Sequence, residues 1–282
     1  MGTHTTGILL TYYERYVDYA ILQFDAFLRT LPGTCSMIVV HNGPTPIKNN
    51  RPDLKIFTGD NSVREFSGWE VGLAHCRHSG LVEKSDLMVF ANDTFCHHNK
   101  FGPVTRFAFR QTFCQLLKVP SAPVVAGEIH SLGKSFSIDG LESDRWVATY
   151  LFGLSRGMLH QLHRMMPLTE MADFYCDDAD ALDFSDRVSP NLASHVKQWL
   201  QGSGRTRWKG TDATGTLTLA QLQGKANSIL CEKYLSAYAL AQGGTLLDVF
   251  ESGSLRQLRR VEALPKKLVS MFGSQRNDLF ST

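Results

Sequence analysis

The chain has 282 residues, of which 43% are hydrophobic and 20% are charged, and its formal net charge at pH 7 is +2. This composition is typical of a globular protein with enough apolar residues to bury a sizeable core. The nearly balanced charge excludes nucleic-acid binding through bulk electrostatic attraction, so no nucleic-acid partner is expected. The length allows one large domain or two small ones.

Cysteine usage and hydropathy indicate a reducing, cytoplasmic location. None of the six cysteines forms a CxxC pair or a zinc-like cluster, and several lie in apolar contexts typical of buried free thiols. The first residues lack the basic and apolar regions of a signal peptide. No apolar stretch approaches the roughly 20 residues that are needed to span a bilayer.

Strands and helices alternate through the first hundred residues. Short apolar runs predict strands, and apolar residues at helical spacing predict helices between them. Strands are predicted over residues 7–12, 36–40, 54–58 and 87–91, with helices over 15–31 and 67–78, the second capped by Ser67. Residues 83–86 are predicted to form a polar turn before the fourth strand.

The later part of the chain is less regular. The pattern predicts helices over residues 104–117, 156–166 and 217–243, strands over 123–128 and 146–154, and a loop-rich segment over 169–215. We expect a single domain over residues 1–250, with a nucleotide-binding half up to about residue 119 and an acceptor half over 120–250. Residues 251–282 form a basic tail.

This alternation predicts an α/β fold with a mostly parallel sheet. Right-handed crossovers then bring the carboxyl ends of the strands to one edge. The polar clusters expected at that edge are Tyr12-Tyr13-Glu14, His41-Asn42, Asp60-Asn61 and Asn92-Asp93.

The apolar run LMVFA ends abruptly in Asn92, Asp93 and Thr94. A carboxylate that follows a buried strand lies where open α/β sheets bind their ligands. The alternative is that Asp93 only shapes a turn or caps the next segment. A second segment, FSGWEVGL over residues 66–73, places two glycines near a predicted helix start. Glycine there permits close approach of a ligand to the backbone, and free amides favour phosphate; alternatively, the glycines only pack tightly.

Three segments together resemble the rhamnan synthesis protein F family of bacterial polysaccharide glycosyltransferases. They are FSGWEVGL (66–73), LMVFANDTFCHHNKFGP (87–103) and ILCEKYLS (229–236) followed by Gly243. The chain departs from the family pattern at Glu65 and Ser67, and through the inserted His97 and His98. The resemblance implies a GT-A-like, Rossmann-like fold with a helical C-terminal region. It also implies transfer of a hexose or deoxyhexose from a nucleotide-sugar to a growing surface glycan of the O-antigen or capsule type.

The resemblance implies that Asp93 is a catalytic residue that coordinates Mg²⁺ or Mn²⁺ on the donor diphosphate. His97 or His98 could add a nitrogen ligand, or the reaction could proceed without metal. The remaining expected contacts to the nucleotide-sugar are Thr11, Tyr12, Asn42, Asp60, Arg64, Gly68, Trp69 and Asn92. Lys100 and Arg145 are further candidates for neutralising phosphate.

An inverting transferase needs a base for the proton of the acceptor hydroxyl. Glu128 is the first candidate, because it ends a predicted strand in the acceptor half. The other candidates are Asp139, Glu142, Asp144, Asp177 and Asp178.

Residues 254–272 place apolar side chains at near-helical spacing with five Arg or Lys residues between them. Such a basic amphipathic helix suits an anionic membrane surface, which would place a cytoplasmic enzyme peripherally on the inner membrane beside a lipid-linked acceptor. The alternative is a helix that packs on the domain. Two other functions remain open, a non-catalytic nucleotide-binding partner of a polysaccharide-assembly complex and a nucleotide-binding regulatory module. Release of nucleotide from a sugar donor would distinguish the enzyme from both.

Overall fold

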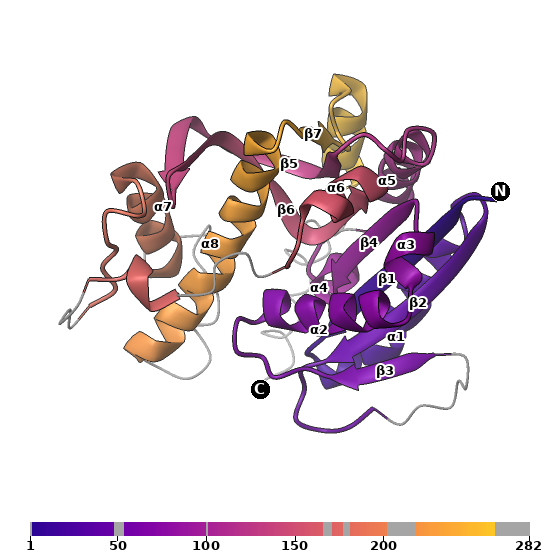
Figure 1. Ribbon diagram of the computed structural model, residues 1–282, viewed down its shortest axis with the longest axis horizontal. Helices are drawn as coiled ribbons and strands as arrows, with labels where there is room; N and C mark the ends of the chain where they lie inside the picture. Colours follow the sequence, from indigo (N-terminus) through magenta and orange to yellow (C-terminus); the bar gives the residue numbers. More distant parts are fainter. Residues whose placement is uncertain are drawn as a thin grey trace, which may run out of the picture.

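The computed structural model describes residues 2–47, 54–99, 101–165, 171–176, 181–201 and 218–262. These residues form a seven-stranded sheet in the order β3-β2-β1-β4-β6-β5-β7 (Figure 1). The strands are β1 (His4–Thr11), β2 (Thr34–His41), β3 (Lys55–Thr58), β4 (Leu87–Asn92), β5 (Val124–Ile138), β6 (Leu141–Ser155) and β7 (Thr245–Asp248). Only β6 is antiparallel to its neighbours. The predicted α/β fold with a mostly parallel sheet is therefore confirmed, and strands from both predicted halves share this one sheet.

Helices cover both faces of the sheet. They are η1 (Glu14–Tyr16), α1 (Val17–Leu28), α2 (Glu65–His78), α3 (Leu81–Lys84), α4 (Thr94–His97), α5 (Pro103–Leu116), α6 (Arg156–Gln161), η2 (Met171–Phe174), α7 (Pro190–Gln201) and α8 (Leu219–Ala241). Residues 253–262 are also helical. In Figure 1, α2 and α8 run across the front of the sheet, and α7 lies on the side opposite the N-terminus.

Strand residues alternate between two apolar layers, as the two-residue period of a strand requires. Ile8 and Leu10 of β1 pack in the layer that holds α2, α7 and α8. Leu9 packs in the opposite layer with α1 and α5. Because the central strands are covered on both faces, each contains a short continuous apolar run, which is why their pattern predicted strands correctly.

Several boundaries differ from the prediction. Helix α2 begins after Arg64 rather than after Ser67, because the Ser67 hydroxyl folds back to accept the amide of Val63 and to donate to the carbonyl of Arg64. Residues 83–86, predicted as a turn, are partly α3, and α6 is shorter than predicted. Part of the predicted loop-rich segment is α7, which buries Leu192, Val196 and Leu200 at four-residue spacing.

Strands β5 and β6 form a hairpin that is longer than predicted, and its pairing is interrupted next to the sheet edge. Gly127 pairs with Phe152 and Ile129 pairs with Val147, so only Glu128 lies opposite residues 148–151. Such an irregularity changes the direction in which the side chains point. It turns Ala148, Thr149 and Tyr150 toward the cavity described below.

Candidate functional site

The carboxyl ends of β1, β2, β3 and β4 meet at one edge of the sheet, as the sequence predicted. Side chains tie these ends together. Thr11 Oγ1 lies 2.8 Å from His41 Nδ1, which links β1 to β2. The side-chain amide of Asn42 donates to Asn61 Oδ1 at 3.3 Å and to the carbonyl of Arg64 at 3.2 Å. The conformation of this edge is therefore stabilised by hydrogen bonds of Thr11, Asn42 and Arg64.

A cavity of about 370 Å³ opens at this edge, and we call it the strand-end cavity. It lies between the start of α2, the end of β4, the irregular part of β6, and helices α7 and α8. Its polar lining residues are Glu65, Asn92, Thr94, His130, Thr149, His195, Lys225, Ser228, Glu232 and Lys233, and its aromatic ones are Trp146, Tyr150 and Trp199. The carboxyl edge of an open α/β sheet is the usual position of a ligand site.

Two carboxylate–ammonium pairs line the strand-end cavity. Glu232 Oε1 lies 2.5 Å from Lys233 Nζ, and Glu232 Oε2 accepts the amide and hydroxyl of Thr149 at 2.9 and 2.8 Å. Burial opposes ionisation of Glu232, but the Lys233 charge and these hydrogen bonds outweigh it and lower the pKa of its carboxyl. The second pair is looser, with Glu65 Oε1 3.4 Å from Lys225 Nζ. The cavity thus contains one tightly held and one loosely held carboxylate.

Aromatic rings form part of the cavity wall. The ammonium of Lys233 lies 3.8 Å from the ring centroid of Trp146, and His130 stacks on the same indole at 5.9 Å between centroids. Burial lowers the pKa of Lys233, and the Glu232 charge opposes that shift. Flat apolar rings beside hydrogen-bonding groups suit a ligand that has a ring with polar substituents.

Asp93 is fully buried rather than facing the cavity. Its Oδ2 accepts the backbone amides of Tyr12 and Tyr13 at 2.7 and 2.9 Å, so it joins the end of β4 to the chain after β1. Burial raises the pKa of Asp93 to about 6, although these two hydrogen bonds oppose the shift. The arrangement matches the alternative in which Asp93 shapes a turn.

The residues around Asp93 do not fit the divalent cation that the resemblance implies. Asp93 Oδ1 lies 3.8 Å from His97 Nε2 with no hydrogen-bond partner in the described chain, and both side chains are at most 4% exposed. His97 stacks on Tyr16, and burial lowers its pKa to about 4. Across the described ranges, no group of three or more His, Cys, Asp or Glu side chains could hold a metal ion.

Glu128 does not itself line the strand-end cavity, and its carboxylate is already engaged by other side chains. Its carboxylate binds the guanidinium of Arg259 and accepts the Tyr150 hydroxyl at 2.7 Å. Burial alone would raise its pKa, but hydrogen bonds from His130, Arg259 and Tyr150 overcome that effect and lower it to about 2. A carboxylate with so low a pKa is a weak base, so this geometry does not favour Glu128 as the catalytic base.

Gly68 and Trp69 belong to the core rather than to a ligand surface. A Cβ on Gly68 would lie 2.3 Å from Leu10 Cδ1, so this glycine allows α2 to pack closely on β1. Trp69 is fully buried, and its indole donates to the carbonyl of Ala91 at 3.2 Å. Because these positions face the interior, their geometry does not favour the predicted roles in donor approach and stacking.

The other predicted residues are dispersed. Asn92 lines the strand-end cavity, whereas the Tyr12 hydroxyl reaches Glu65 Oε2 at 3.4 Å. Exposed Asp60 accepts the amide and hydroxyl of Ser62, and that amide hydrogen bond lowers its pKa. The β5–β6 hairpin carries Asp139, Glu142, Asp144 and Arg145, none of which lines the cavity. Lys100, Asp177 and Asp178 lie outside the described residues.

Sequence reasoning missed most of the cavity wall. Glu232 and Lys233 belong to the ILCEKYLS segment and Glu65 is a departure from the family pattern, but neither pattern indicates what these side chains do. Trp146 and Lys225 carry no local signal, because only the packing of α8 on β6 brings them into the cavity wall.

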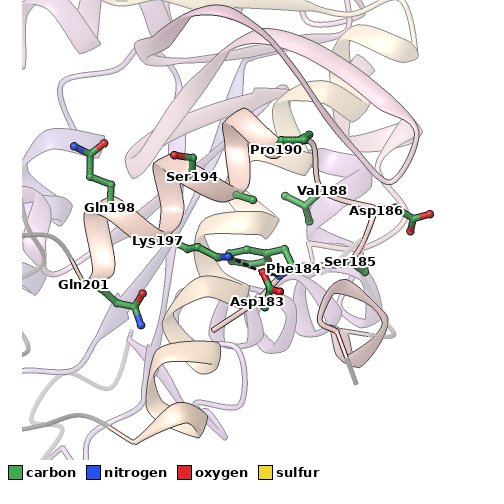
Figure 2. A pocket seen from close by; sticks show the side chains of 11 residues that line it. Asp183, Phe184, Ser185, Asp186, Val188, Pro190, Ser194, Lys197, Gln198 and Gln201 are labelled. Carbon is green, nitrogen blue, oxygen red and sulfur yellow. Dashed lines mark hydrogen bonds and ion pairs between the residues drawn. The ribbon is translucent and has the colours of Figure 1, made fainter. Parts of the chain in front are cut away.

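A larger open hollow of about 1090 Å³ lies along α7, lined by residues of the 183–201 segment (Figure 2). Its one ion pair joins Lys197 to Asp183 at 2.6 Å, and Figure 2 shows Gln198, Gln201 and Asp186 pointing outward. It lacks the converging buried charges of the strand-end cavity, so we place the candidate site in the smaller cavity.

The described residues include no helix with both the length and the apolar character that crossing a membrane requires. In comparisons with known proteins, the chain matches no family model and no curated protein.

Proposed function

We propose that the protein is a glycosyltransferase that moves a sugar from a nucleotide-sugar to a growing bacterial surface glycan. The observation that carries the proposal is the strand-end cavity, with its two carboxylate–ammonium pairs beside the indole of Trp146. The sheet order is compatible with the GT-A-like fold that the resemblance implies. Two of the three resembling segments line the cavity, through Asn92 and Glu232, and Glu65 lies directly before the remaining one.

Glu65 is the carboxylate best suited to act as the base. Its contacts to Lys225 Nζ and the Tyr12 hydroxyl are both 3.4 Å long, which leaves its oxygens available to an incoming hydroxyl. In the transfer, the acceptor hydroxyl gives its proton to Glu65 while its oxygen bonds to the anomeric carbon. The bond from that carbon to the nucleoside diphosphate breaks, and the diphosphate leaves with the electron pair.

Glu232 is better suited to holding the neighbouring side chains of the cavity in position. Both of its carboxylate oxygens already accept hydrogen bonds, Oε2 from Thr149 and Oε1 from Lys233. This network fixes the ammonium of Lys233 over Trp146 and so shapes the floor of the cavity. Because the surroundings of Asp93 do not fit a metal ion, no step of the proposal depends on one.

A non-catalytic nucleotide-binding partner is the second candidate. The observation that favours it is the buried Asp93, which engages backbone amides where a diphosphate-binding enzyme would present a carboxylate to a metal.

A panel of nucleotide-sugars, tested by thermal shift with and without Mn²⁺ and by assay of released nucleoside diphosphate, separates these functions. A ligand that binds only the folded state raises the melting temperature by mass action. We expect one donor to raise the melting temperature and to release its nucleoside diphosphate when a glycan acceptor is added. Binding without release would favour the non-catalytic partner, and no binding by any donor would contradict both.

A further inference from the structure

A second pocket, which we call the arginine pocket, lies next to the strand-end cavity. It encloses about 410 Å³ between the irregular part of β5 at Glu128, the segment after α4 and the helix of residues 253–262. Its polar lining residues are His98, Asn99, Glu128, Arg256, Arg259 and Arg260. Three guanidinium groups from one helix converge there. The sequence predicted that this helix contacts a membrane surface.

The arginine pocket retains positive charge after its internal ion pairs are counted. Arg256 binds the carboxylate of Asp248, and Arg259 binds that of Glu128. Arg260 has no hydrogen-bond or ion-pair partner within the described part of the chain. One guanidinium is therefore uncompensated beside two whose donors are only partly used, an arrangement that favours an oxyanion.

The helix that carries these arginines is held in place at its other end. Glu262 Oε1 accepts the backbone amide of Val104 at 3.0 Å, and Glu262 Oε2 accepts the Thr105 hydroxyl at 3.2 Å. These contacts place a carboxylate at the N-terminus of α5, where the helix dipole favours negative charge. The guanidinium of Arg259 also lies 4.3 Å from the ring centroid of Phe250. The arginines are therefore positioned before any ligand arrives.

Tyr150 connects the two hollows. It lines the strand-end cavity, and its hydroxyl donates to Glu128 in the wall of the arginine pocket. The end of β4 and the start of α4 likewise contribute Asn92 and Thr94 to the cavity, and the residues after α4 contribute His98 and Asn99 to the pocket. A ligand whose sugar occupies the cavity could therefore place an adjoining anionic group in the pocket.

We propose that the arginine pocket binds a phosphate group of a substrate that reaches into the strand-end cavity. That the anion is a phosphate rests on the proposed function, because a nucleotide-sugar and a lipid-linked glycan both carry phosphate next to a sugar. Guanidinium forks bind phosphate through paired hydrogen bonds. Arg260 supplies the uncompensated charge, and Arg256 and Arg259 supply the surrounding donors.

The test compares Arg260→Gln with the wild type in binding inorganic pyrophosphate, measured by calorimetry on the full chain. Since Arg260 has no described partner, the variant should keep the wild-type melting temperature. Its affinity for pyrophosphate should fall roughly tenfold, as expected for loss of one charge-assisted hydrogen-bonding group. Arg29→Gln is the matched control, because it removes the same charge from the end of α1 and should leave the affinity unchanged.

Two further probes identify the source of the phosphate. If it belongs to the donor, Arg260→Gln should weaken binding of nucleoside diphosphates; if it belongs to a lipid-linked acceptor, the variant should weaken binding to vesicles that contain a polyprenyl phosphate. Equal pyrophosphate affinity in the wild type and Arg260→Gln, or no binding by the wild type, would overturn the proposal. Loss of phosphate binding in the variant without any sugar transfer by the wild type would support the pocket and contradict only the proposed function.

Discussion

The guanidinium of Arg259 binds the carboxylate of Glu128, 131 residues earlier in the chain. This ion pair joins the C-terminal helix of residues 253–262 to the irregular part of β5, and both side chains are less than one quarter exposed. The first part of the segment that was predicted as a membrane-binding helix is therefore packed on the domain.

Replacing Arg259 should destabilise the fold, because it leaves the Glu128 carboxylate partly buried without its cation. We expect Arg259→Gln to lower the free energy of unfolding by about 2 kcal/mol at pH 7. The pKa of Glu128 is lowered on folding, so its contribution is present above its unfolded pKa and is lost as the pH falls through about 2. Urea unfolding from pH 7 to pH 2 should thus show a weaker acid dependence in Arg259→Gln; an unchanged acid dependence would contradict this account.

Two truncations separate packing from membrane binding. Removing everything after Gly253 deletes the contacts of Arg256, Arg259 and Glu262, so it should lower the melting temperature. Removing only the residues after Glu262 keeps those contacts, so this variant should have a higher melting temperature than the one that ends at Gly253. If the membrane prediction is correct, the shorter deletion should reduce binding to anionic vesicles, and added salt should weaken wild-type binding. Unchanged vesicle binding after both deletions would contradict the membrane prediction.

Asp93 and His97 should impose opposite pH dependences on stability. The pKa of Asp93 is raised to about 6, so its contribution is full below its unfolded pKa of 3.8 and is lost as the pH rises through 6. The pKa of His97 is lowered from 6.5 to about 4, so the unfolded chain binds more protons in that range and stability rises with pH. Two pKa units correspond to about 3 kcal/mol, and the two effects nearly cancel in the wild type.

Single variants should reveal the pH dependence of stability that each residue contributes. Asp93→Asn keeps an acceptor for the Tyr12 and Tyr13 amides and should leave a stability that rises from pH 4 to 6.5. His97→Phe keeps an aromatic ring against Tyr16 and should leave a stability that falls from pH 4 to 6. Denaturant unfolding across this range measures both slopes, and slopes of the same sign in the two variants would contradict the assignment.

Gly68 and Gly224 provide a matched pair of helical glycines. A methyl group at Gly68 would meet Leu10 in the core, whereas one at Gly224 has nothing within 4 Å. We expect Gly68→Ala to cost about 1–3 kcal/mol through overpacking. Gly224→Ala should stabilise the protein by roughly 0.5–1 kcal/mol through helix propensity. If Gly68→Ala instead weakens donor binding without a change in unfolding free energy, the glycine has the ligand-facing role first predicted for it.

The fold was predictable from sequence where apolar patterning is strong. The central strands are covered on both faces, so β1, β2 and β4 each contain an unbroken apolar run. Helix α7 was missed because its apolar stripe is narrow and polar residues such as Lys197 fill the intervening positions. Strand β7 has only four residues and completes the sheet by pairing with β5, a contact that no local pattern encodes.

The candidate site was less predictable, because it depends on contacts between distant segments. Trp69 was expected at a ligand surface, but the face of α2 that carries it is buried. Lys233 resembles an ordinary helix cation in sequence, and it becomes a buried cavity residue only because α8 packs it against Trp146 and beside Glu232. Polar clusters at strand ends predicted the correct edge of the sheet without identifying which side chains face the cavity.

The most direct test of the central claim is the rate at which Glu65→Gln releases nucleoside diphosphate from the nucleotide-sugar that the wild type uses, with a glycan acceptor present. Glu142→Gln is the control, because it makes the same change at an exposed position on the β5–β6 hairpin. We predict that Glu65→Gln stays folded and loses roughly a hundredfold or more in rate, as removal of a general base does, while Glu142→Gln keeps the wild-type rate. A folded Glu65→Gln variant with the wild-type rate would contradict transfer in the strand-end cavity with Glu65 as the base.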